Sequence, residues 1–186
     1  MPRLEREVEL GPARLTWGEW PGRRGPLVCL VDPVGRAPHG VAEVLASALA
    51  PEWRVLELSP RACLPYQAQA AELVEFLDTF GFQQSVLLGS GVTAALALVV
   101  AAWYPTRLAG LILLNGTLSA ATRARLVAHS GTYPALRAWL DAPPRWRSIE
   151  RQIACPLLRV RARSPRGVVE PTRAFLTSRV QSEACG

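Results

Sequence analysis

The sequence predicts one α/β domain with a mostly parallel sheet of about seven strands, an N-terminal antiparallel hairpin and helices on both faces. Three observations predict this fold. The apolar run 85–88 reads as a buried strand, which a Gly-Ser-Gly turn joins to an Ala- and Leu-rich helix ending near residue 103. Further apolar runs of the kind buried in parallel sheets alternate with helical periods. Two alternating segments joined by Gly-Pro open the chain, as in a hairpin.

In the first half of the chain, the spacing of apolar residues predicts each helix and strand, and proline and glycine residues predict where the elements end. Apolar residues at 41, 44, 45, 48 and 49 give a helix one buried face, and Pro51 stops that helix. Gly81 is the expected C-cap of the second helix. In order, we expect hairpin strands at 4–10 and 13–17, a loop at 20–26, a strand at 27–31, a helix at 41–50, a strand at 54–58 and a helix at 66–80.

The second half continues the alternation after the central strand, turn and helix. A Tyr-Pro pair closes the helix and the apolar run to Asn115 is the next buried strand. We then expect short helices at 117–128 and 133–140, a loop at 143–147, a strand at 157–163 and a helix at 171–180. Residues 1–186 are therefore expected to form a single domain.

Composition narrows the class of protein. Hydrophobic residues make up 49% of the chain and charged residues 19%, as in a globular domain. All 21 basic residues are arginines and the formal net charge is +6, but the arginines are scattered among acidic residues in the N-terminal third, so no nucleic-acid role is expected. The longest apolar run, 94–104, is too short to cross a bilayer, so no transmembrane segment is expected.

The cysteines and the N-terminus point to an intracellular setting. Four widely spaced cysteines form no C-x-x-C pair, which is typical of reduced thiols rather than of a disulfide frame or a zinc site. The first seven residues are charged and lack the apolar core of a signal peptide. We therefore expect a cytoplasmic protein with no metal and no cofactor.

The Gly-Ser-Gly turn marks the expected crevice. In a strand-turn-helix unit, the carboxyl end of the strand and the helix N-terminus face one crevice, where free backbone N–H groups can hold an anion. The residues expected to line this crevice are Asp32, Pro33, Gly89, Ser90, Gly91, Val92 and Asn115.

Residues 84–115 resemble the α/β-hydrolase family, whose members carry a strand, a Gly-x-Ser-x-Gly nucleophile turn, a helix ending near Tyr-Pro and another strand in this order. On that pattern Gly89 is the first glycine, Gly91 stands at the nucleophile and Thr93 replaces the second glycine. The resemblance thus implies that the nucleophile is missing. Ser90 at the variable position is interpreted as a turn serine bonded to its own helix end.

Other family positions also depart from the pattern. The family has a His-Gly loop after its third strand and takes an oxyanion N–H from it, whereas this chain has Asp32-Pro33, and proline has no N–H. No carboxylate follows strand 157–163 at the place of the family's acid, and no strand remains for its final histidine. The resemblance therefore implies a minimal fold without the cap domain and the last strand, with a reduced cap region at about 116–153. His129 and Asp141 take no catalytic role.

With the last strand missing, strand 157–163 would form an edge of the sheet. Arg159, Arg161 and Arg163 alternate there with apolar residues. Charge on an edge discourages aggregation, and the same arginines could dock an acidic partner or a second copy of the chain.

These observations favour a non-catalytic module that binds a protein partner, itself or a small apolar ligand. An unusual ester or acyl hydrolase built on Ser90 or Cys63 is the alternative. A dinucleotide-binding protein is a third, because Gly89-Ser90-Gly91 begins a literal G-x-G-x-x-A match.

Overall fold

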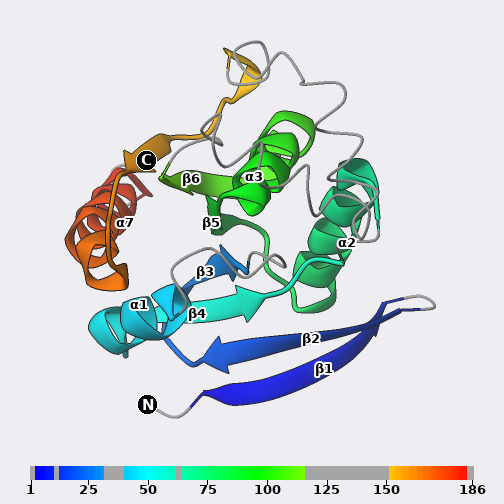
Figure 1. Ribbon diagram of the computed structural model, residues 1–186, viewed down its shortest axis with the longest axis horizontal. Coiled ribbons are helices and arrows are strands. Elements are labelled where there is room, and N and C mark those ends of the chain that lie inside the picture. The colour runs from blue at the N-terminus through cyan, green and yellow to red at the C-terminus, as the bar shows by residue number, and fades with distance from the viewer. Residues whose placement is uncertain (1–2, 11–12, 32–39, 62–63, 116–150, 184–186) are drawn as a thin grey trace.

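The computed structural model describes residues 3–10, 13–31, 40–61, 64–115 and 151–183, which build a sheet between two layers of helices (Figure 1). The strands are β1 (Leu4–Leu10), β2 (Ala13–Trp20), β3 (Arg24–Leu30), β4 (Trp53–Leu58), β5 (Ser85–Ser90), β6 (Leu108–Leu114) and β7 (Leu157–Val160). The helices are α1 (Val41–Leu49), α2 (Tyr66–Thr79), α3 (Val92–Trp103) and α7 (Val169–Glu183), with short 3-10 turns η1 (Pro105–Arg107) and η3 (Pro165–Val168).

The sheet has seven strands in the described part of the chain, in the order β1-β2-β4-β3-β5-β6-β7. β1 and β2 form the antiparallel hairpin and β2 pairs antiparallel with β4. β3, β4, β5, β6 and β7 run parallel, so their carboxyl ends meet at one edge. This arrangement confirms the predicted fold class.

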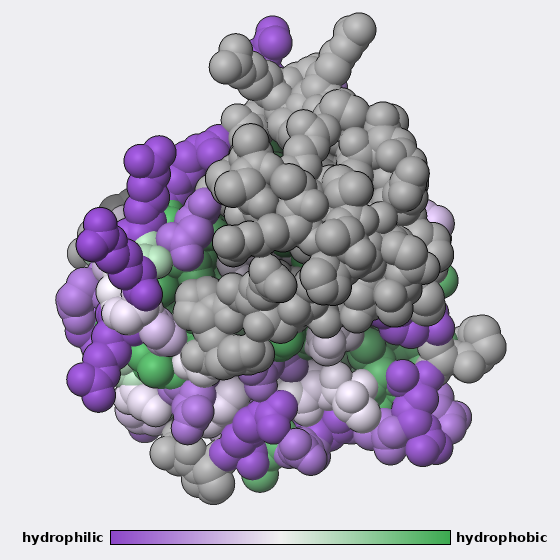
Figure 2. Space-filling view, viewed as in Figure 1, coloured by the Kyte–Doolittle hydropathy of each residue, from purple (hydrophilic) through white to green (hydrophobic). Residues whose placement is uncertain are grey.

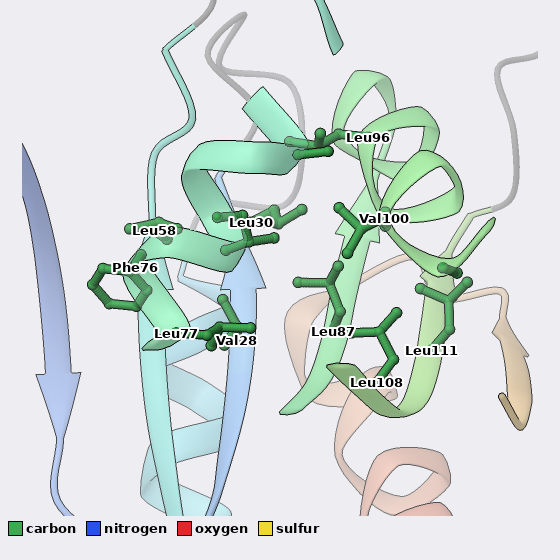
Figure 3. Close-up of a cluster of buried hydrophobic side chains, with 14 of the residues drawn as sticks. Val28, Leu30, Leu58, Phe76, Leu77, Leu87, Leu96, Val100, Leu108 and Leu111 are labelled. Carbon is green, nitrogen blue, oxygen red and sulfur yellow. The ribbon is translucent and has the colours of Figure 1, made fainter. Parts of the chain in front are cut away.

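Two hydrophobic layers sandwich the sheet. Val28, Leu87 and Leu111 face α2 and α3 in one cluster (Figure 3), whereas Val86 and Leu88 face α1 and α7 in the other. Because side chains alternate along a strand, a strand covered on both faces must be apolar throughout. All six residues of β5 are buried, so the strand that leads into the candidate turn is also the centre of the core.

The N-terminal elements follow the prediction with small extensions. β2 runs to Trp20 rather than residue 17, since Trp20 is buried and pairs with Val55 of β4. β3 begins at Arg24, inside the predicted loop, because Arg24 pairs with Trp53. Gly81 has φ 69 and its N–H donates to the carbonyl of Asp78, as expected of a helix C-cap.

The predicted strand 157–163 is wrong at its carboxyl end. β7 stops at Val160, so of the three predicted edge arginines only Arg159 lies on the strand, and Arg161 and Arg163 lie on the loop behind it. α7 begins at Val169, before the predicted residue 171. The predicted helices 117–128 and 133–140 and the loop 143–147 lie outside the described residues. Among the described helices, none has the length and apolar character that a membrane crossing requires.

Leu87 tests the central position of β5. Its side chain is fully buried, so Leu87→Ala should lower the free energy of unfolding by about 2–5 kcal/mol through lost transfer energy and a cavity. Leu4→Ala, at a residue 37% exposed on the outer strand, should cost less than about 0.5 kcal/mol. Urea unfolding followed by circular dichroism measures both. Equal losses in the two variants would contradict a core centred on β5.

Candidate functional site

Gly91 forms the tip of the candidate turn. β5 ends at Ser90, α3 begins at Val92, and Gly91 between them has φ 55 and ψ −121. These angles match the first central residue of a type II′ turn, a conformation that suits glycine and strains residues with a Cβ. The turn predicted from sequence is therefore present, with glycine at its strained position.

Gly89 lets the strand and the helix approach each other. A Cβ on Gly89 would lie 2.6 Å from the carbonyl oxygen of Thr93 and 2.9 Å from Cα of Ala94. Both atoms belong to the backbone of α3, which cannot move without disturbing the helix. Gly89 is thus required by close packing rather than by a contact with a ligand.

Thr93, not Ser90, supplies the side-chain hydrogen bonds of the turn. The Thr93 hydroxyl accepts a hydrogen bond from the backbone N–H of Ser90 at 3.1 Å. It donates to the carbonyl of Leu30 at 3.2 Å and also lies 2.9 Å from the carbonyl of Ser90. In the described part of the chain no side chain caps the start of α3, so the expectation that Ser90 does so is wrong. The Thr93 hydroxyl ties the end of β5 to the end of β3.

Tyr66 is a residue of the turn that sequence reasoning missed. It is the first residue of α2, and its hydroxyl donates to the carbonyl of Val92 at 3.3 Å. Tyr66 is also packed against the α2 and α3 core cluster. Nothing in its sequence neighbourhood marks this role, because Val92 lies 26 residues further along the chain.

Asn115 is a joint between strands. Its φ is 60, its backbone N–H donates to the carbonyl of Val160 at 2.7 Å, and its Oδ1 accepts from the N–H of Ala162 at 2.9 Å. The side chain thus replaces a backbone carbonyl in the ladder between β6 and β7. This bond turns the chain out of the strand and explains why β7 ends at Val160.

The structure brings the Gly91 turn and the loop that begins at Arg161 to the same edge of the sheet, although they are far apart in the sequence. Ser90 pairs with Leu114 of β6, and Leu114 pairs with Val160 of β7. The residues that follow, Gly91, Asn115 and Arg161, therefore leave the sheet side by side at its carboxyl edge. Adjacent strands lie about 4.8 Å apart, so the turn and the arginine loop are about 10 Å apart along the sheet. Asp32 and Pro33 lie outside the described residues.

A charged groove of about 550 Å³ lies next to the hairpin, and its lining includes Val31 and Ser59, which directly follow the carboxyl ends of β3 and β4. Arg3 and Glu57 are among its lining residues and form an ion pair at 3.0 Å, and Arg3 also pairs with Glu5 at 2.8 Å. The charged groups of this groove are thus matched within the protein.

The described thiols are poor nucleophiles. Burial raises the pKa of Cys29 strongly, with a smaller contribution from Glu57, and burial also raises the pKa of Cys155. Both cysteines are free thiols. Since the thiolate is the reactive form, neither thiol is activated at neutral pH. Cys63 lies outside the described residues.

Comparison with known proteins identifies the fold. No protein-family model and no curated protein sequence matches this chain. Among solved structures, a candidate lipase from Acinetobacter baumannii AYE is similar at a TM-score of 0.70 and 9% identity, over 97% of this chain and 93% of its own. The thioesterase domain from the curacin biosynthetic pathway is similar at 0.64 and 12%, over 95% and 90%.

An α/β hydrolase from the metagenome of sediments of the Mar Chica lagoon, Morocco, is similar at a TM-score of 0.58 and 14% identity, over 96% of this chain and 99% of its own. The chain has the α/β-hydrolase fold. At such low identity, the likeness shows the fold alone. In the Gly-x-Ser-x-Gly pattern the nucleophile stands on a strand-to-helix turn, and the turn between β5 and α3 in this chain holds Gly91.

Thr93 tests the hydrogen bonds of the turn. Thr93→Val keeps the shape and removes the hydroxyl, which leaves the buried N–H of Ser90 without its partner. The free energy of unfolding should fall by about 1–3 kcal/mol. Thr93→Ser keeps the hydroxyl and is the matched control. Urea unfolding of both variants decides the point, and a larger loss in Thr93→Ser than in Thr93→Val would show that packing of the methyl group, not the hydroxyl, matters.

Asn115 tests the joint between β6 and β7. Asn115→Gly accepts the same positive φ but lacks Oδ1, so the N–H of Ala162 loses its acceptor. Amide hydrogen exchange at Ala162 should speed up by about tenfold or more, while exchange at Leu87 in the core stays unchanged. Unchanged exchange at Ala162 would mean that the loop is held by other contacts.

Proposed function

We propose that this protein is a non-catalytic member of the α/β-hydrolase fold that acts as a binding or assembly module for a protein partner or a small apolar ligand. The observation that carries the proposal is Gly91 at the tip of the turn, with φ 55 and ψ −121. Acyl transfer on this fold needs a hydroxyl or thiol at that tip. Glycine keeps the turn and provides no reacting atom.

Ser90 is poorly placed to replace the nucleophile. It is the last residue of β5 and only 4% exposed. Because side chains alternate along a strand, Ser90 shares the face of Val86 and Leu88, which pack toward α1 and α7. A nucleophile must instead stand at the tip between strand and helix, so the position of Ser90 argues against hydrolysis through its hydroxyl.

The packing of the turn supports retention of a binding crevice. Gly89, Thr93 and Tyr66 hold the strand end, the first turn of α3 and the start of α2 in fixed positions. A rigid crevice loses little conformational entropy when it binds. In this proposal residues 1–186 act as one domain in the cytoplasm, and residues 116–153 take the place of a reduced cap.

An ester assay tests the non-catalytic part of the proposal. Wild-type protein should release no p-nitrophenol from short p-nitrophenyl esters above a heat-denatured control, and Ser90→Ala should behave identically. Turnover that Ser90→Ala abolishes would make the protein a hydrolase with an unusual nucleophile.

Gly91→Ser should lower the free energy of unfolding by about 1–3 kcal/mol, because a side chain at this φ is strained.

Copurification from the native source tests the binding part. Mass spectrometry of the purified protein should find a stoichiometric protein partner or a bound apolar molecule. Addition of NAD should leave the melting temperature unchanged, whereas a clear rise would support the dinucleotide alternative. A monodisperse monomer that carries neither a partner nor a ligand would contradict a binding role.

A further inference from the structure

We propose that Arg161, Arg163 and Arg166, here called the β7–η3 arginines, bind an acidic segment of a partner protein. They lie on the loop after β7 and in η3, and all three are exposed. Figure 2 shows hydrophilic side chains gathered over β7 and α7 on the left of the molecule. The inference rests on the proposed function, because it names the partner chemistry and the place where a binding module would meet it.

The β7–η3 arginines differ from most arginines of the described chain in having no ion pair there. Eight other arginines of the described chain form ion pairs with acidic side chains. The paired arginines are Arg3, Arg6, Arg14, Arg24, Arg54, Arg61, Arg107 and Arg173. These three guanidinium groups, which have no ion pair in the described ranges, lie within six consecutive residues. They form a local excess of positive charge, which an acidic ligand would complement.

The loop that carries these arginines is firmly held. Ala162 donates its N–H to Asn115 Oδ1, Gly167 donates its N–H to the carbonyl of Ser164 at 3.1 Å, and Val168 is fully buried. A Cβ on Gly167 would lie 3.3 Å from Cβ of Ala162, so the two ends of the loop are in close packing. The arginines are thus presented on a fixed backbone, which lowers the entropic cost of binding.

An acidic polypeptide fits this surface better than a nucleic acid or a membrane. Single-stranded nucleic acid needs exposed aromatic rings for stacking, and the described aromatic residue in this region, Phe175, is partly buried with its ring close to Gly110. Membrane binding needs apolar side chains that insert. The exposed large hydrophobic residues of the described chain are Leu4, Phe80 and Trp103, all on other elements.

The geometry suggests an extended segment with acidic residues at alternate positions. Arg161 and Arg163 are two residues apart, at most about 7 Å between Cα atoms. Alternate side chains of an extended peptide are about 6.7 Å apart, so carboxylates at every second position match this spacing. Each guanidinium can then take a carboxylate in a bidentate pair.

The test uses a fluorescein-labelled twelve-residue peptide of alternating Glu and Gly, with binding measured by fluorescence anisotropy. The full-length variant Arg161→Gln/Arg163→Gln/Arg166→Gln should bind it about tenfold more weakly than wild type, because three exposed pairs are lost. The matched control, Arg14→Gln/Arg23→Gln/Arg24→Gln, removes the same charge from residues near the hairpin and should change the affinity less than about twofold. Urea unfolding verifies that both variants are folded.

Equal weakening in the two variants would overturn the inference, since net charge alone would then explain binding. Tighter binding of a twelve-nucleotide DNA strand or of phosphatidylserine vesicles than of the peptide would also overturn it. Ester turnover would contradict the proposed function and leave this peptide measurement unchanged, so the two failures are distinguishable.

Discussion

The close approach of β5 and α3 is the constraint on which the rest of the structure depends. β5 lies between β3 and β6 with all six residues buried, and its single glycine, Gly89, lies against the backbone of α3. The Thr93 hydroxyl bonds back to Ser90 and reaches Leu30 at the end of β3. The shape of the turn is therefore part of the core packing, and it persists whatever side chain stands at its tip.

Because the turn is held by core packing, its shape can persist on the α/β-hydrolase fold when the residue at its tip lacks a nucleophilic side chain. A nucleophile at the tip must hold an L-residue at a strained φ, and the surrounding packing supplies the energy for that strain. Glycine at position 91 adopts φ 55 without a Cβ and relieves the strain. The turn thus keeps its shape without that strain, and in the proposed function the residues that fix the turn set the geometry of binding.

The spacing of apolar residues and the positions of glycine and proline predicted most elements of the fold, because those signals are local. Buried runs, amphipathic helices and the Gly-Pro hairpin depend on neighbours within a few residues. The errors came from distant contacts. The period of Arg159, Arg161 and Arg163 indicates a strand, but β7 ends early because Ala162 donates to Asn115, 47 residues away in the sequence. Likewise, local preference favoured Ser90 as the residue that bonds the end of the helix. The side-chain bond is instead made by Thr93, whose hydroxyl reaches the carbonyl of Leu30, far away in the sequence.

The candidate site was predicted as two separate features, a crevice and a charged edge, and only the register of the sheet joins them. Ser90, Leu114 and Val160 are level, so the turn, the joint at Asn115 and the arginine loop leave the sheet together. The position of a loop relative to another strand follows from pairing and cannot be read from either segment alone.

The distribution of charge favours the approach of acidic molecules to the carboxyl edge of the sheet. Around the hairpin and β4, arginines and glutamates neutralise one another in ion pairs such as Arg6 with Glu19 and Arg14 with Glu7. In the described part of the chain, positive charge is therefore distributed unevenly, with the β7–η3 arginines as a local excess. A field of this kind steers acidic molecules toward one side of a protein before contact. Because that side is the carboxyl edge of the sheet, an acidic partner held by the arginines would lie next to the Gly91 turn.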